Sequence, residues 1–120
     1  MKILICDDSK AMRLIVTRTL RQADLGDHEF IEATNGAEGL EAVRAHAPGL
    51  ILSDWNMPTM TGIEFLEALK AEDYRGKFCF VTSESNEEMR ARAFNGGAQG
   101  FITKPFTPES FRAALGAILS

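Results

Sequence analysis

The sequence has little of several features that mark specialised classes of protein. Two cysteines in 120 residues are too few for the disulfide framework of a small secreted domain. No apolar run approaches the roughly 18 residues of a membrane span. The stretch 3–6 is too short for a signal peptide, and Asp7 and Asp8 follow it at once. We therefore expect a single domain over residues 1–120, in the cytoplasm and without membrane insertion.

The chain also lacks an excess of positive charge. The chain has 13 basic and 17 acidic residues, which gives a formal net charge of −4. This balance argues against direct binding to nucleic acid through positive charge. Four prolines and ten glycines are ordinary usage, so the composition is not that of a disordered chain.

Short apolar runs recur along the chain, and a helical pattern follows each of them. The runs cover 2–6, 29–33, 50–53, 78–81 and 100–103. Continuous apolar runs are typical of parallel strands that are buried on both faces. Five such β-then-α units predict an α/β fold, a doubly wound parallel sheet with helices on both faces.

Helix starts are indicated by capping residues. The spacing of a capping box occurs at Asn35 with Glu38, Thr61 with Glu64, and Ser85 with Glu88. Ser9 is the expected cap of the first helix, and Thr107 precedes a proline at the first position of the last helix. The expected buried stripe of the first helix is Met12, Ile15, Val16 and Leu20.

Polar residues stand where four of the five predicted strands end. In sheets of this kind, ligands bind beyond the carboxyl ends of the strands. The residues at these ends are Asp7-Asp8, Asp54, Thr82-Ser83 and Lys104-Pro105. Three carboxylates, a hydroxyl and an ammonium group are therefore expected at one edge of the sheet.

Three ionised carboxylates in one place repel each other, and a hard divalent cation or proton uptake relieves that repulsion. Mg²⁺ prefers oxygen ligands and binds through one or two carboxylates together with water and phosphate oxygens. Lys104 offsets further negative charge. An aspartate beside such a cation can attack phosphorus and form an aspartyl phosphate.

This set of residues resembles the receiver domain of two-component response regulators. The resemblance covers the whole chain and includes Met57-Pro58, Gly62, Ala98, Gly100 and Phe106. Within the family, the segments 54–58 and 104–107 are similar to the stand-alone chemotaxis type. The resemblance implies a flavodoxin-like (βα)5 fold with strand order 2-1-3-4-5.

The resemblance also implies roles for the residues at the sheet edge. Asp54 would take a phosphoryl group from a histidine kinase. The cofactor would be Mg²⁺ or Mn²⁺, with Asp8 and Asp54 as side-chain ligands, Asp7 acting mainly through water, and Asn56 binding through its backbone carbonyl. Thr82 and Lys104 would contact the phosphoryl group, and the bond before Pro105 would be cis.

The resemblance further implies a switch and an output face. Thr82 would move toward the phosphoryl group while the aromatic residue Phe101 turns inward. Chemotaxis members have tyrosine at the Phe101 position, and phenylalanine offers no hydroxyl there. Asn56 and Glu84 would modulate dephosphorylation. The output face, which would bind a downstream protein, comprises Arg90, Arg92, Phe101, Thr103 and Arg112.

Two other classes of function are disfavoured by particular residues. An aspartate-nucleophile phosphatase needs a second acid two residues after the nucleophile, and Asn56 stands at that position. A flavodoxin-type cofactor binder needs a phosphate-binding loop after its first strand, where Asp7 and Asp8 would repel phosphate. We expect a phosphoacceptor switch whose only catalysis is its own phosphorylation and dephosphorylation.

Several points stay open from the sequence. The downstream protein is either a flagellar motor switch, in chemotaxis, or a relay protein, in a phosphorelay or developmental pathway. No output domain is expected after Ser120, although a receiver excised from a longer chain would look the same. Trp55 is either a packing residue or a partial lid. Cys6 and Cys79 are expected to be buried and unpaired.

Overall fold

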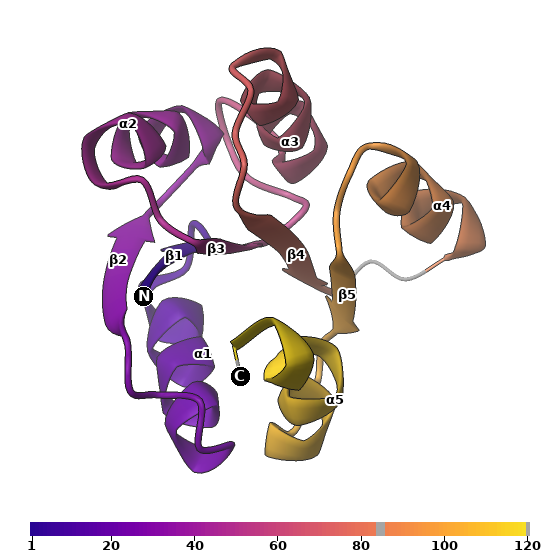
Figure 1. Cartoon of the computed structure of the whole chain (residues 1–120). Coiled ribbons are helices and arrows are strands. Elements are labelled where there is room, and N and C mark those ends of the chain that lie inside the picture. The colour runs from indigo at the N-terminus through magenta and orange to yellow at the C-terminus, as the bar shows by residue number, and fades with distance from the viewer. Residues whose placement is uncertain (84–85, 120) are drawn as a thin grey trace.

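The structure is a computed structural model that describes residues 1–83 and 86–119 (Figure 1). In these ranges, five parallel strands alternate with five helices. The sheet has the order β2-β1-β3-β4-β5, which confirms the expected fold class and strand order. The strands are β1 (Lys2–Cys6), β2 (Glu29–Ala33), β3 (Leu50–Ser53), β4 (Lys77–Thr82) and β5 (Gly100–Thr103). The helices are α1 (Lys10–Gln22), α2 (Gly36–His46), α3 (Gly62–Ala71), α4 (Glu87–Asn95) and α5 (Pro108–Leu119).

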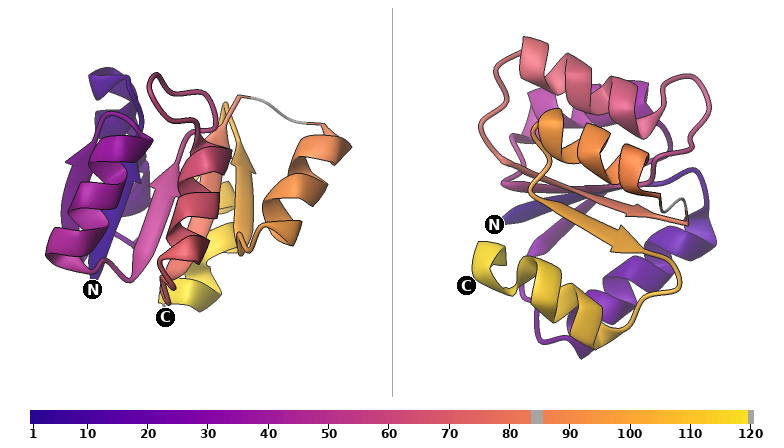
Figure 2. Two further views of the ribbon diagram at one scale, coloured as in Figure 1. Left: turned by 90° about the horizontal axis from the view of Figure 1, so that it is seen from above. Right: turned by 90° about the vertical axis from the view of Figure 1, so that its right-hand side faces the viewer.

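Helices cover both faces of the sheet (Figure 2). Helices α1 and α5 lie on one face, and α2, α3 and α4 lie on the other. Successive side chains of a strand point to opposite faces, so each strand contributes to two buried layers. In β3, Ile51 packs into the layer under α2, α3 and α4, whereas Leu50 and Leu52 pack against α1 and α5.

Most predicted caps are where the sequence places them. The side chains of Ser9 and Asn35 accept hydrogen bonds from the backbone N–H groups of Met12 and Glu38. Thr61 forms a complete capping box with Glu64. Each bond satisfies a backbone N–H that has no partner within the first turn of its helix.

Helix α4 begins one residue later than its predicted cap implies. Its cap is Asn86, whose side chain accepts a hydrogen bond from the N–H of Met89. Asparagine is as good a cap as serine, so Ser85 and Asn86 were both suitable by residue type. The capping-box spacing favoured Ser85, and that prediction is wrong. Ser85 itself lies outside the described residues.

Helix α1 presents a different face to the core than the apolar pattern predicts. Ile15 is 41% exposed, which corrects its assignment to the buried stripe. The buried positions are Arg13, Val16, Thr19 and Leu20. A long polar side chain can bury its methylene groups, and an apolar pattern does not detect this.

Among the described residues, no helix combines the length and the apolar character that a membrane crossing needs.

Candidate functional site

The carboxyl ends of β1, β3, β4 and β5 bring the predicted residues to one edge of the sheet. Strands β1 and β3 are neighbours with Cys6 opposite Ser53, so Asp7 and Asp54 follow them side by side. The N–H of Asp54 donates to the carbonyl of Cys6 at 2.9 Å, which ties the two strand ends together. On the other side, the N–H of Lys104 donates to the carbonyl of Thr82, also at 2.9 Å.

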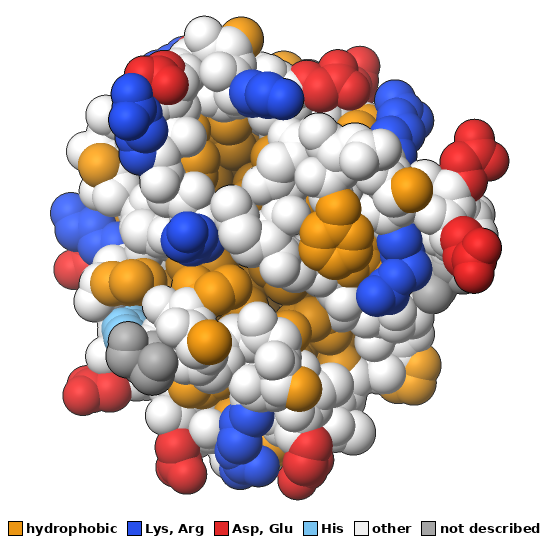
Figure 3. Space-filling view, turned by 45° about the vertical axis from the view of Figure 1, so that its right-hand side comes forward, with side chains coloured by type: hydrophobic (Ala, Val, Ile, Leu, Met, Phe, Trp, Pro, Cys, Tyr) orange, Lys and Arg blue, Asp and Glu red, His pale blue; other side chains and the backbone are white. Residues whose placement is uncertain are grey.

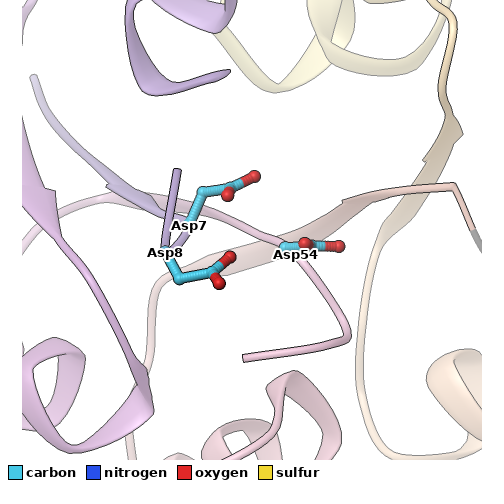
Figure 4. A group of neighbouring side chains, drawn as sticks. All are labelled: Asp7, Asp8 and Asp54. Carbon is cyan, nitrogen blue, oxygen red and sulfur yellow. The ribbon is translucent and has the colours of Figure 1, made fainter. Parts of the chain in front are cut away.

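Three carboxylates gather at this edge. Asp7, Asp8 and Asp54 each offer an oxygen, and these oxygens lie within 4.8 Å of one another. Figure 4 shows the three carboxylates extending from the ends of β1 and β3 to the same side. Asp7 is buried and Asp8 is exposed, so the cluster opens to solvent on the Asp8 side. A compact set of oxygen donors fits a hard divalent cation such as Mg²⁺.

Lys104 supplies the positive charge within this cluster. Its Nζ lies 3.1 Å from Oδ2 of Asp7 and 3.6 Å from Oδ2 of Asp54. The Asp7 carboxylate also accepts a hydrogen bond from the N–H of Ser9 at 2.9 Å. The peptide bond between Lys104 and Pro105 is cis, as the resemblance implies. Asp7 and Lys104 therefore hold each other in place beside Asp54.

Asp54 is held at both carboxylate oxygens. Oδ1 accepts a hydrogen bond from the N–H of Trp55 at 2.8 Å, and Oδ2 faces Lys104. Burial raises the pKa of Asp54 above its ordinary 3.8, while Lys104 and a hydrogen bond with Thr82 offset part of that rise. The carboxylate is thus partly desolvated and fixed in orientation, which suits a nucleophile that attacks in line.

Gly62 allows the loop after Asp54 to lie against the start of α3. A Cβ at this position would clash with the Asp54 carbonyl oxygen and with the Phe80 ring. The N–H of Gly62 donates to the Trp55 carbonyl at 2.7 Å. The missing side chain therefore permits a backbone contact that fixes the segment carrying Asp54.

Trp55 and Phe101 belong to a cluster of aromatic rings beneath the site. The Trp55 ring lies 4.8 Å from Phe80 and 6.5 Å from Phe101, measured between centroids. Trp55 is 7% exposed, so of its two predicted roles the structure supports packing. Phe101 is 8% exposed, and the Arg90 guanidinium lies 5.1 Å from the centroid of its ring.

The five residues of the predicted output face do not all lie together. Figure 3 brings the α4 and β5 side of the molecule forward and shows basic side chains among hydrophobic ones. Arg90 contacts Phe101, and Arg92 and Thr103 lie on the same two elements. Arg112 instead donates to the carbonyls of Ala23 and Gln22 at 3.2 Å each, beyond the end of α1 and at its last residue. The last carbonyls of a helix have no partner within the helix and carry partial negative charge, so they attract a cation. Arg112 therefore turns toward α1 and away from α4.

Other predicted residues have simpler placements. Cys6 and Cys79 are both buried and free, as expected. Burial raises the pKa of each thiol to about 12. Asn56 is exposed beside Trp55. Glu84 lies outside the described residues.

Two residues near the site were missed by sequence reasoning. Arg13 is only 9% exposed and donates through Nη1 to the main-chain carbonyl of Asp7 at 2.6 Å. Its Nε donates to Oε1 of Glu32, on β2, at 2.8 Å. The only signal in the sequence is the position of Arg13 between Met12 and Val16 in the expected apolar stripe.

Comparisons with known proteins agree with this geometry. The sequence-family model described as the response regulator receiver domain matches residues 3–116. The chain is 36% identical to chemotaxis protein CheY1 of Helicobacter pylori strain J99, over 99% of this chain and 97% of that protein. It is 37% identical to chemotaxis protein CheY of Pseudomonas aeruginosa, over 91% of this chain and 88% of that protein.

The solved structures agree as well. Chemotaxis protein CheY4 of Vibrio cholerae superposes with a TM-score of 0.85 at 33% identity and covers 98% of both chains. The family match spans nearly the whole chain, and membership of this family supports a phosphoacceptor switch of two-component signalling rather than a conventional enzyme. The chain belongs to the response regulator receiver domain family.

Proposed function

We propose that Asp54 accepts a phosphoryl group from the phosphohistidine of a histidine kinase, with Mg²⁺ or Mn²⁺ held at the sheet edge. The observation that carries this proposal is the placement of Asp54 within 4.8 Å of the carboxylates of Asp7 and Asp8, facing Lys104. An Asp54 oxygen forms the new bond to phosphorus while the bond between phosphorus and the kinase imidazole breaks. The imidazole keeps the electron pair of that bond.

The residues around Asp54 would have two roles, which are to bind the cation and to neutralise the charge of the phosphoryl group. Asp8 and Asp54 would hold the cation by their side chains, Asp7 through water, and Asn56 through its backbone carbonyl. A cation held there would supply positive charge to the phosphoryl oxygens. Lys104 would neutralise further charge on the phosphoryl group, and the Thr82 hydroxyl would donate to one of its oxygens. Asn56 and Glu84 would set how readily water reaches the aspartyl phosphate.

The energy available for a conformational change is limited. Shifting a two-state equilibrium from 1:99 to 99:1 requires about 5.5 kcal/mol. Two charge-assisted hydrogen bonds contribute about 3–6 kcal/mol if both are new. Thr82 already bonds to Asp54 and Lys104 already pairs with Asp7, so phosphorylation exchanges partners and yields less. A downstream protein that prefers the active form supplies the remainder.

The downstream contact is proposed at the surface of α4 and β5. Arg90, Phe101 and Thr103 lie on this surface, whereas Arg92 contacts Glu67 of α3 at 3.9 Å. Phe101 packs against Trp55, the residue next to Asp54. The route from phosphorylation site to surface therefore crosses two aromatic side chains. Chemotaxis, with a flagellar motor switch as the target, is favoured over a phosphorelay because two relatives that are 36% and 37% identical, over 99% and 91% of this chain, are chemotaxis proteins. The protein would act in the cytoplasm as a domain spanning residues 1–120.

Phosphoryl uptake tests the proposal. Acetyl phosphate with Mg²⁺ should add one phosphoryl group that hydroxylamine removes, because acyl phosphates are sensitive to that nucleophile. Asp54→Asn should abolish the label, and Asp8→Ala should lower the rate at limiting Mg²⁺. Asp24→Asn is the matched control, since Asp24 lies beyond the end of α1 and away from this edge. Retention of the label in Asp54→Asn would overturn the assignment of Asp54.

A further inference from the structure

Arg13 is a buried charged residue that the proposed phosphoryl chemistry does not use. It lies in the first turns of α1 and is 9% exposed. Burying a guanidinium is costly unless its donors are paired. Nη1 donates to the Asp7 main-chain carbonyl at 2.6 Å, and Nε donates to the Glu32 carboxylate at 2.8 Å. These two bonds explain how the buried charge of Arg13 is accommodated. They also show that Arg13 ties the main chain at Asp7 to the side chain of Glu32.

The carbonyl that Arg13 contacts belongs to the peptide unit joining Asp7 to Asp8. The N–H of Asp7 makes the last bond to β2, donating to Ala33 at 3.1 Å, and the chain then leaves the sheet. The Arg13 bond therefore fixes the orientation of the next peptide unit. The Asp8 side chain is exposed and starts from that unit, so its direction depends on it.

Glu32 fixes the guanidinium in turn. It lies on β2 opposite Ile5 of β1, and its side chain is 51% exposed whereas that of Arg13 is 10% exposed. The planar guanidinium presents its donors in a rigid fork, so one bond at Nε sets the direction of the bond at Nη1. The Glu32 carboxylate also balances the positive charge, which would otherwise oppose a cation beside Asp8.

We propose that Arg13 is a positioning residue for the divalent cation. It orients the peptide between Asp7 and Asp8 so that the Asp8 carboxylate faces Asp54, and Glu32 keeps Arg13 in that role. This inference rests on the proposed cation site. Partners that orient metal ligands typically change metal affinity by about 10–100-fold when they are removed.

The test is a Mg²⁺ titration of the full chain, followed by the fluorescence of Trp55, the only tryptophan. Arg13→Met removes the donors and keeps a long apolar side chain, and should raise the Mg²⁺ dissociation constant about tenfold or more. Arg13→Lys keeps the charge without the fork and should be intermediate. Arg18→Met is the matched control, because Arg18 is an exposed arginine on the same helix, and should leave the constant unchanged.

A second readout separates positioning from a general loss of structure. At saturating Mg²⁺, Arg13→Met should be labelled by acetyl phosphate at the parental rate, because its defect lies in cation affinity. A loosened fold would instead slow labelling at every Mg²⁺ concentration, and that result would overturn the positioning role. If Arg13→Met fails to fold, as judged by circular dichroism, Arg13→Lys takes its place and should still bind Mg²⁺ more weakly than Arg18→Met.

The outcomes for Arg13 and for the cation site are distinguishable. A parental dissociation constant in Arg13→Met, alongside lost binding in Asp8→Ala, would overturn the role of Arg13 and leave the cation site standing. Absence of Mg²⁺ binding in the parent protein, measured by calorimetry as well as fluorescence, would overturn both.

Discussion

The two faces of the sheet are packed with different side chains. The layer under α2, α3 and α4 holds the aromatic residues Trp55, Phe65, Phe78, Phe80 and Phe101. The layer against α1 and α5 is mostly aliphatic, with Phe111 as its one fully buried aromatic residue among the described positions. Only the first layer includes the residue that follows Asp54. We infer that events at Asp54 reach the surface through the aromatic layer, while the aliphatic layer supports the fold.

The rings of the aromatic layer form a connected series. Phe80 lies 4.8 Å from Trp55, 4.9 Å from Phe78 and 6.0 Å from Phe101, measured between centroids. Their tilted and edge-on arrangements are the ones that aromatic pairs prefer. Moving one ring therefore requires its neighbours to adjust, because protein interiors are closely packed.

The largest expected effect is on stability, and it should be similar in both layers. Phe80→Ala and Phe111→Ala each remove a fully buried ring and should lower the free energy of unfolding by about 3–5 kcal/mol. Urea unfolding measures this effect. Only Phe80→Ala should also change Trp55 emission in the folded state and its response to phosphorylation.

The contrast between these variants tests the comparison itself. If the alanine variants do not fold, the same measurements are made on Phe80→Leu and Phe111→Leu, which retain more of the buried volume. An equal change of the Trp55 response on substitution of Phe111 would show that the two layers are not separate in function.

A smaller effect is expected where the aromatic layer reaches the surface. Arg90→Gln removes the cation above the Phe101 ring and should lower stability by about 0.5–1 kcal/mol. It should also shift the NMR signals of the Phe101 ring. Arg92→Gln is the control, because Arg92 makes an exposed contact with Glu67 at 3.9 Å and lies on the same helix. Unchanged Phe101 signals in Arg90→Gln would remove Arg90 from the proposed route.

The smallest effect concerns pH and the charge on Asp54. Its pKa is raised in the folded protein, so its ionisation lowers stability as pH rises from about 3.8 through the folded-state pKa. Without divalent cations, Asp54→Asn should therefore be more stable than the parent at neutral pH. The difference should shrink as pH falls toward 4, as measured by thermal unfolding across that range. A difference that grows on acidification would contradict the direction of the pKa shift.

The sequence predicted the positions that periodicity and strand ends determine. The apolar runs predicted β1, β2, β3 and β5 at their observed bounds. Strand β4 is one residue longer at each end than its apolar run, because the polar residues Lys77 and Thr82 also pair with neighbouring strands. The gathering of Asp7, Asp54 and Lys104 followed from strand ends, but the strand order that makes them neighbours came from the family resemblance.

The remaining features depend on contacts between distant side chains. The burial of Arg13 rests on the carbonyl of Asp7 and the carboxylate of Glu32, so no pattern within α1 reveals it. The direction of Arg112 likewise depends on where α1 ends. Both are long polar side chains whose position is set by a partner rather than by their own helix.

The location of the phosphoryl group tests the central claim most directly. Borohydride reduces an aspartyl phosphate to homoserine, which marks the modified position in a peptide. Full-length protein treated with acetyl phosphate and Mg²⁺, then reduced and analysed by peptide mass spectrometry, should carry homoserine at position 54 alone. Homoserine at position 7 or 8 with none at 54, or its absence from a protein that has taken up phosphate, would contradict the account.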